Sequence, residues 1–264
     1  MIDLKAITFR YTNLIPVFEG FDWHVDRQST WAVLGPSGCG KSTLLQLLAG
    51  LSQPQSGTLT IDGIPLERPR PKTGLILQEY GLLPWATLRD NVALGLRIRE
   101  FYGPDGRHAP RGRRIDREMV KDRVEHWLEH LGIAEIARAY PRQVSGGQRQ
   151  RTAVARALVL QPDLLLMDEP FSALDAPTRE RMQMLTLRLC AEAGATMILV
   201  THNIEEAAFV GQRILILGHP PNRSPRIVNN HHRADDAYRE SPKYQKVCTD
   251  LRSALHRIEE PKSL

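Results

Sequence analysis

The chain is poor in cysteine and has no long apolar run. Its 264 residues include three cysteines, Cys39, Cys190 and Cys248. They are too few for a disulfide framework and lack metal-ligand spacing, so we expect a reduced, cytoplasmic setting. No apolar stretch approaches the roughly 18 residues that a membrane-spanning helix requires. The first residues, Met1 to Lys5, lack the charged-then-apolar order of a signal peptide.

The charge balance is modestly basic. The net charge is +5 and the isoelectric point is near 9.3, which suits nucleic acid or an anionic membrane surface, but also an ordinary solvated surface. We favour the solvated surface because seven arginines fall within residues 97–117. The same segment is rich in glycine and proline, so it is predicted to be a loop or hairpin.

A glycine-rich loop separates an expected strand from an expected helix. It fits the pattern G-x-x-x-x-G-K-[ST] with Gly35, Pro36, Ser37, Gly38, Cys39, Gly40, Lys41, Ser42 and Thr43. Residues 31–34 predict a buried strand before it, and residues 44–48 the apolar face of a short helix after it. Backbone N–H groups and the helix dipole of such a loop face a phosphate. We expect Lys41 to reach the β- and γ-phosphates of a nucleotide and Ser42 to hold Mg²⁺.

Two adjacent carboxylates follow a second apolar run, residues 164–167. Asp168 and Glu169 therefore stand at the C-terminal end of a predicted buried strand, where ligands gather in open α/β sheets. Asp168 is placed to hold Mg²⁺, and Glu169 to act as the general base toward water. A solvated acidic turn is the alternative, which the nearby phosphate loop disfavours.

A second rare element is Ser145-Gly146-Gly147-Gln148 at an expected helix start. Such a start is another anion-binding N-terminus, although it also fits a plain glycine-rich helix cap. A chain with one phosphate cradle has little use for a second on the same phosphate. We therefore expect the Ser145 helix of one subunit to cover the nucleotide held by the loop of another.

Strands and helices alternate around the phosphate loop, which predicts an α/β fold with a largely parallel sheet. Short apolar runs between residues 2 and 34 predict an antiparallel β subdomain in front of it. After Pro220, Pro221 and Pro225, a helical stripe with Ser241 as its cap predicts a small C-terminal appendage.

These motifs, in this order, resemble an ATPase subunit of the ABC transporters, over about residues 1–220. The resemblance rests on residues 35–43, Gln78, residues 144–148, Asp168-Glu169, residues 172–175 and His202. It implies a P-loop NTPase of the ABC type with a RecA-like core, an antiparallel β subdomain and an α-helical signature subdomain. It further implies an ATPase domain over residues 1–228, with the helical subdomain at about 86–160, and a helical appendage over 229–264.

The resemblance assigns roles to individual residues. Tyr11 resembles the aromatic that stacks on adenine, although it also fits a strand aromatic. Gln78 resembles the glutamine that contacts Mg²⁺ and the attacking water and links the site to a membrane partner. Ser145 to Gln148 resemble the signature that binds the γ-phosphate across a dimer, and Asp175 the aspartate that touches the partner subunit. His202 resembles the switch histidine at the γ-phosphate, although alone it would more often be structural.

Finer features resemble the importers of the nitrate, sulfonate and taurine class. Residues 78–85, 90–96, 169–175 and 201–207 carry this similarity. Val144 stands where leucine is usual, Asn203 where aspartate is usual, and the segment 97–117 is longer than that class requires. Docking of that segment on a partner or on lipid headgroups is one hypothesis, and a solvated insertion is the other.

The expected function is ATP hydrolysis that drives an importer of a small anion or organic solute, such as nitrate, a sulfonate, taurine or bicarbonate. The expected cofactors are ATP and Mg²⁺. The expected partners are a permease, a substrate-binding protein and a second ATPase subunit, identical or homologous, on the cytoplasmic face of the membrane. The alternatives are the ATPase of an exporter and an ABC ATPase acting on nucleic acid, which we do not expect because no long coiled coil separates Lys41 from Ser145.

Overall fold

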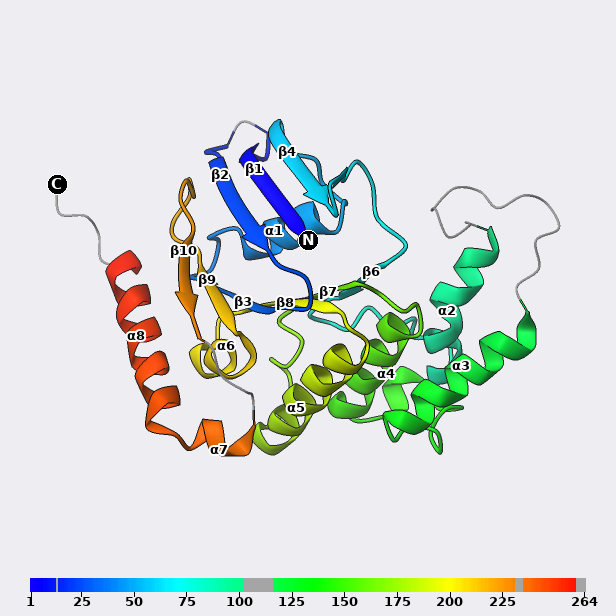
Figure 1. Cartoon of the computed structure of the whole chain (residues 1–264). Helices are drawn as coiled ribbons and strands as arrows, with labels where there is room; N and C mark the ends of the chain where they lie inside the picture. Colours follow the sequence, from blue (N-terminus) through cyan, green and yellow to red (C-terminus); the bar gives the residue numbers. More distant parts are fainter. Residues whose placement is uncertain (13, 102–115, 231–234, 260–264) are drawn as a thin grey trace. The chain divides into compact units, whose positions relative to one another are not determined.

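The computed structural model describes residues 1–12, 14–101, 116–230 and 235–259. The chain forms two compact units, and Figure 1 labels most of their helices and strands. Unit 1 comprises residues 1–69 and 195–264, and unit 2 comprises residues 70–194.

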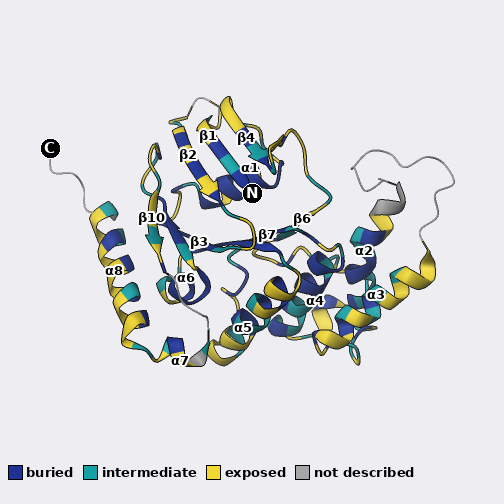
Figure 2. Ribbon diagram, viewed as in Figure 1, coloured by how far each residue is buried: buried dark blue, intermediate teal, exposed yellow. Residues whose placement is uncertain are grey.

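Unit 1 contains an antiparallel sheet in the order β2-β1-β4-β5. Its strands are β1 (Ile2–Phe9), β2 (Phe18–Val25), β4 (Ser56–Ile61) and the short β5 (Ile64–Pro65). Along β2 buried and exposed residues alternate, which is the pattern of a strand with one face on the core. Figure 2 shows this alternation along the ribbon. The predicted antiparallel β subdomain is present.

The same unit holds parallel strands that are buried on both faces. They are β3 (Thr30–Leu34), β8 (Thr196–Thr201) and β9 (Arg213–Ile216), with β10 (Arg226–Asn229) antiparallel at the edge. β3 lies between β8 and β9. Continuous apolar sequence such as that of β3 suits a strand covered on both sides. The helices α1 (Lys41–Leu48) and α6 (Ile204–Val210) follow β3 and β8.

Unit 2 combines a parallel pair of strands with most of the helices. β6 (Thr73–Ile76) pairs with β7 (Leu164–Asp168). The helices are α2 (Leu88–Phe101), α3 (Arg117–His130), α4 (Gly146–Leu158) and α5 (Ala176–Glu192), with a 3-10 turn η1 (Pro141–Gln143) before α4. α4 packs against α2, α3, α5 and β6, so it is the central helix of the unit.

The end of the chain forms two helices in unit 1, α7 (Asp236–Arg239) and α8 (Pro242–Glu259). The predicted apolar stripe of α8 includes Tyr244 and Leu251, which are buried, and α8 packs on α6. Tyr244 donates a hydrogen bond to the Glu205 carbonyl oxygen (3.0 Å), and Arg252 pairs with the Glu205 carboxylate (3.0 Å).

One expectation about local structure is partly wrong. The arginine-rich segment was expected to be a loop from residue 97 to residue 117, but its first five residues continue α2 and Arg117 opens α3. Asp116 caps α3 by accepting hydrogen bonds from the Glu118 and Met119 N–H groups. Such a cap explains why a helix starts there. The rest of the segment, residues 102–115, lies outside the described residues.

The helices of the described ranges include none whose length and apolar content would let it cross a membrane.

A histidine between two carboxylates provides a test of how the antiparallel sheet is stabilised. His24 on β2 faces Asp3 on β1 (Nδ1 to Oδ1, 2.7 Å) and also contacts Asp26 (Nε2 to Oδ1, 3.0 Å). The hydrogen bond to Asp3 raises the pKa of His24 above 6.5, and the hydrogen bond from His24 lowers the pKa of Asp3 below 3.8. The contribution of the His24–Asp3 pair to the free energy of unfolding is therefore complete between about pH 4 and pH 6.5. It is lost as the pH rises through the folded pKa of His24.

We predict that removal of the His24 imidazole lowers the melting temperature in a pH-dependent way. His24→Gln lowers the melting temperature by about 1–2 °C near pH 5.5, because the pair is exposed and its worth is small. The difference from wild type disappears by about pH 9. The exposed His219, which has no ion pair among the described residues, supplies the control variant His219→Gln. A pH-independent difference for His24→Gln contradicts this assignment.

Candidate functional site

The glycine-rich loop connects β3 to α1 in unit 1. The Lys41 side chain is folded back onto the loop and is only 8% exposed. Its Nζ donates hydrogen bonds to the carbonyl oxygens of Gly35 (2.8 Å) and Pro36 (2.9 Å). The ammonium group therefore lies within the loop at whose centre we expect a phosphate.

Two glycines of this loop are required by close contacts. Gly40 has φ of 107°, and a Cβ there would come within 2.4 Å of Val17 Cγ1. A Cβ on Gly35 would come within 2.7 Å of the Leu217 carbonyl oxygen and 2.6 Å of Cys39 Sγ. The backbone is thus packed against β2 and the end of β9, and no larger residue fits. Cys39 is fully buried, and burial raises the pKa of its thiol, so it is an inert packing residue.

Tyr11 lies beside the helix that follows the loop. Its hydroxyl is 3.1 Å from Thr43 Oγ1 and 3.5 Å from Gln46 Oε1, and its ring meets Phe9 edge-on at 5.1 Å. The residue is 44% exposed. Tyr11 is therefore an accessible aromatic next to Thr43, as the expected contact with a base requires.

His202 follows β8 on the same sheet edge as the loop. Leu34 of β3 pairs with Thr201 of β8, so Gly35 and His202 leave neighbouring parallel strands at their carboxyl ends. Asn203 then caps α6: its Oδ1 accepts a hydrogen bond from the Glu206 N–H at 2.8 Å. Asn and Asp are equally good caps, so the unusual asparagine keeps the backbone after His202 in place.

In unit 2, predicted site residues also lie at the carboxyl ends of two parallel strands. Ile76 of β6 pairs with Met167 of β7, so Gln78 emerges on the same side as Asp168 and Glu169. Glu169 has φ of 45°, an uncommon backbone conformation for a residue with a side chain. Ser172 Oγ donates to its carbonyl oxygen at 2.9 Å. Strain of this kind gathers at functional sites, which agrees with the role we expect for Glu169.

The segment after Gln78 is anchored by side chains that sequence reasoning missed. Arg156 of α4 donates to the carbonyl oxygens of Tyr80 (2.6 Å) and Gly81 (2.5 Å), and desolvation lowers the pKa of Arg156.

A second anchor of this segment is Asn91. It is completely buried, accepts a hydrogen bond from the Leu83 N–H at 2.7 Å and donates one back to the Leu83 carbonyl oxygen at 3.1 Å. Trp85 is 74% exposed nearby. No sequence pattern points to these anchors. Arg156 is 75 and 76 positions away from the residues that it holds, and Asn91, although only eight positions from Leu83, contacts it through no recognised motif.

Ser145 begins α4 as its cap. Its Oγ accepts from the Gln148 N–H (3.3 Å), and Gln148 Oε1 accepts from the Ser145 N–H (2.9 Å). A Cβ on Gly147 would lie 2.8 Å from Thr178 Cγ2 of α5. Asp175 caps that same helix by accepting from the Thr178 N–H, and this hydrogen bond lowers the pKa of Asp175. The starts of α4 and α5 therefore lie together, so Ser145–Gln148 and Asp175 share one part of unit 2.

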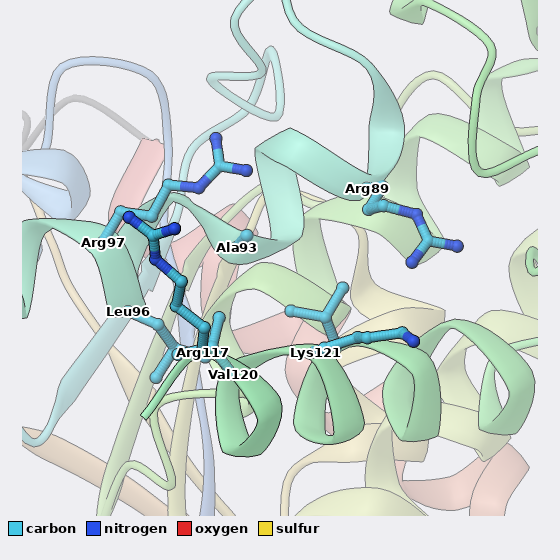
Figure 3. A pocket seen from close by; sticks show the side chains of 8 residues that line it. Arg89, Ala93, Leu96, Arg97, Arg117, Val120 and Lys121 are labelled. Atoms are coloured by element: carbon cyan, nitrogen blue, oxygen red, sulfur yellow. The ribbon is translucent and has the colours of Figure 1, made fainter. Parts of the chain in front are cut away.

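A cavity elsewhere in unit 2 is separate from all of these residues. It has a volume of about 450 Å³ and lies between α2 and α3 (Figure 3). Ala93, Leu96, Val120 and Val124 form its apolar lining. Two of the basic side chains that line the cavity form ion pairs, Arg89 with Glu125 and Arg97 with Asp90. None of the predicted site residues lines it.

The structure thus sorts the predicted residues into two groups. Unit 1 holds Tyr11, residues 35–43 and His202, and unit 2 holds Gln78, residues 145–148, Asp168, Glu169 and Asp175. Among the residues described, no three His, Cys, Asp or Glu side chains cluster as a metal site. A cation here would need hydroxyl or amide oxygens together with carboxylate, a donor set that suits Mg²⁺.

Comparison with known proteins decides the family. The model of the family described as ABC transporter matches residues 18–172. The chain belongs to the ABC transporter family. Its fold class and its ATPase activity follow from that membership, and the predicted family is confirmed.

Similarity to individual ABC proteins supports the same family membership. The chain is 38% identical over 221 residues to the aliphatic sulfonates import ATP-binding protein SsuB of Bacillus cereus, covering 84% of this chain and 81% of that protein. It is 48% identical over 191 residues to the taurine import ATP-binding protein TauB of Pseudomonas aeruginosa, covering 72% and 67%. The dimeric post-hydrolysis structure of the ATP-binding cassette MJ0796 with ADP and Pi matches with a TM-score of 0.72 and 30% identity, covering 88% of this chain and all of that one.

The arginine anchor on the segment after Gln78 yields a prediction. Arg156→Lys replaces a planar fork by a single point donor, so one of the two carbonyl contacts is lost. A hydrogen bond to a charged donor is worth about 1.5–3 kcal/mol, so amide hydrogen exchange over residues 77–85 accelerates by at least about tenfold.

The matched control is Arg151→Lys on the same helix. Arg151 also donates to carbonyl oxygens, those of Leu131 (3.2 Å) and Gly132 (3.4 Å), but not to this segment. Mass-spectrometric exchange should show no change over residues 77–85 in the control. Equal exchange in Arg156→Lys and wild type would refute the anchor.

Proposed function

We propose that the chain is the ATP-hydrolysing subunit of an ABC importer for a small anionic or zwitterionic solute. The observation that carries the proposal is the combination of a formed phosphate loop around Lys41 with a second glycine-rich helix start at Ser145. The import relatives that align over most of the chain support the direction of transport.

Oxygen donors suitable for Mg²⁺ are present on both sheet edges. Ser42 is the second residue of α1, Gln78 follows β6, and Asp168 is the last residue of β7. These three residues would hold the ion, because hard oxygen ligands match its preference. When bound, Mg²⁺ supplies charge neutralisation at the β- and γ-phosphates.

Four side chains act at the phosphate, and a fifth, Tyr11, acts at the base. Lys41 neutralises charge on the transferring phosphoryl group, and Tyr11 stacks on the adenine. Glu169 accepts a proton from the attacking water as general base. His202 and Gln78 orient that water against the γ-phosphate.

Completion of the site requires a second chain, identical or homologous. The Ser145–Gln148 helix start of one chain covers the ATP held by the loop of the other, and Asp175 contacts the partner beside it. Because the Gln148 side-chain oxygen already caps its own helix, the anion-binding groups are the backbone N–H groups and the Ser145 hydroxyl. ATP binding closes the pair, and hydrolysis opens it.

The motion passes to a permease through the anchored segment from Gln78 to Trp85. This segment is tied to α4 by Arg156, and it presents the exposed Trp85 ring. An exposed aromatic on an anchored backbone is typical of a protein interface. The chain thus associates with the cytoplasmic face of the membrane through the permease, and a substrate-binding protein delivers the solute.

Sulfonates and taurine, the solutes named for the relatives, share a small oxyanion group; nitrate and bicarbonate have the same character. The proposal predicts that the permease and the binding protein co-purify with the chain. Calorimetry of that binding protein with taurine, an alkanesulfonate, nitrate and bicarbonate should find one tight ligand. Co-purification with a permease that lacks a binding protein favours an exporter, and tight salt-dependent DNA or RNA binding by the pure chain favours the nucleic-acid alternative.

Glu169→Gln tests the general base. The amide cannot accept the proton, so turnover falls at least about 100-fold while the affinity for ATP changes little, and the ATP-bound pair accumulates. Steady-state hydrolysis, ATP binding and size-exclusion chromatography measure the three effects.

Glu192→Gln is the matched control in the same unit. Glu192 lies on the surface and pairs with Arg188 (3.6 Å) and His130 (3.7 Å), so its loss leaves hydrolysis at the wild-type rate. Wild-type turnover in Glu169→Gln would remove Glu169 from the mechanism.

A further inference from the structure

A buried asparagine after β9 makes direct contact with the phosphate loop. Asn222 stands in the turn between β9 and β10 and is 7% exposed. Its Nδ2 donates to the carbonyl oxygen of Cys39 (2.9 Å) and to that of Val17 (3.2 Å), and its Oδ1 accepts from the Gly218 N–H (2.8 Å). Both donors of the amide are used, and the nitrogen faces two acceptors while the oxygen faces a donor. The amide orientation is therefore unambiguous.

Asn222 is itself held by its backbone. Its N–H donates to the Val17 carbonyl oxygen (3.0 Å), and its carbonyl oxygen accepts from the Glu19 N–H (3.0 Å). These bonds make it a parallel bridge partner of Phe18 at the start of β2. With both backbone groups and the side chain bonded, Asn222 is a fixed point and not a mobile loop residue.

Asn222 constrains the orientation of the peptide bond that joins Cys39 to Gly40. In a planar trans peptide the C=O and the N–H point in opposite directions. Holding the Cys39 carbonyl oxygen against Asn222 therefore directs the Gly40 N–H away from Asn222. Gly40 has a positive φ, and a Cβ there would clash with Val17 just before β2, so only glycine fits on the other side of this peptide.

We propose that Asn222 is a positioning residue that pre-forms the nucleotide cradle by orienting the Cys39–Gly40 peptide. This inference rests on the proposed role of residues 35–43 as the ATP site. The Gly40 N–H is one of the backbone donors that such a loop offers to phosphate. Asn222 thus acts on ATP through the loop backbone, without touching the nucleotide.

Loss of the clamp should affect affinity and not the chemical step. Without Asn222 the buried Cys39 carbonyl oxygen lacks its partner, and the loop spends only part of its time in the binding-competent form. The apparent dissociation constant rises in inverse proportion to that fraction. Bound ATP restores the competent loop, so hydrolysis at saturating ATP stays near the wild-type rate.

The experiment compares three variants of the full-length chain. Asn222→Ala should raise the dissociation constant for Mg-ATP, measured by calorimetry, by about tenfold, the effect expected for an unsatisfied buried group, with kcat within about twofold of wild type. The matched control is Asn230→Ala. Asn230 is also buried and donates to two carbonyl oxygens, those of Ala208 (2.7 Å) and Gly211 (2.9 Å), but the bonds described for it do not reach the loop. A comparable loss of melting temperature with unchanged ATP affinity is expected for the control.

Asn222→Asp supplies a readout that general destabilisation would not give. Its carboxylate faces the carbonyl oxygens of Cys39 and Val17 and cannot donate to them, whereas the protonated acid can donate to one. Burial raises the pKa of such a carboxyl group toward neutrality. The affinity of Asn222→Asp relative to wild type at the same pH should therefore improve as the pH falls from about 8 to about 6.

Three results overturn the inference: unchanged ATP affinity in Asn222→Ala, equal losses of affinity in Asn222→Ala and Asn230→Ala, or a relative affinity of Asn222→Asp that does not depend on pH. Failure of the proposed function is distinguishable. It is signalled by wild-type chain that does not bind ATP, or by wild-type affinity in Lys41→Ala, which removes the ammonium group from the loop.

Discussion

The parallel pairing of β3 with β8 and β9 is the constraint on which the remaining arrangement depends. Parallel strands end at the same edge, so the register that places Leu34 opposite Thr201 also delivers the phosphate loop and His202 to that edge. The pairing of β6 with β7 does the same in unit 2 for Gln78, Asp168 and Glu169. Close packing on both faces favours these registers, because a slip by one residue would turn every side chain to the opposite face and disturb its packing.

Irregular backbone near the site is held by polar side chains that are buried or half-buried. A loop that binds phosphate or a partner cannot use sheet or helix hydrogen bonds, so its carbonyl and N–H groups need other partners. Arg156 supplies them for Tyr80 and Gly81, Asn91 for Leu83, and Asn222 for Cys39. The loops are thereby rigid without being regular, which a preorganised site requires.

Much of this was predictable from sequence because the signals are local. Three of the predicted features are contiguous motifs: the phosphate loop, the Ser145 helix start and the strand that ends at Asp168. The C-terminal helix was predicted from Ser241 as its cap and from an apolar stripe. The anchors were not predictable, since Asn222 and Cys39 are 183 positions apart and no pattern links them. The extension of α2 beyond Arg97 was missed because glycine, proline and arginine further along obscured its helical residues. The predicted domain limits, 1–228 and 229–264, and the roles of the individual site residues stay predictions.

The central claim is that one chain holds only part of each active site, with ATP enclosed between the loop of one chain and the Ser145 helix start of another. The most direct measurement is the rate of ATP hydrolysis per chain across a range of protein concentrations, with the paired fraction determined by sedimentation in the same samples. The account predicts a rate per chain that rises in proportion to the paired fraction. A constant rate per chain in samples that contain only single chains would contradict it.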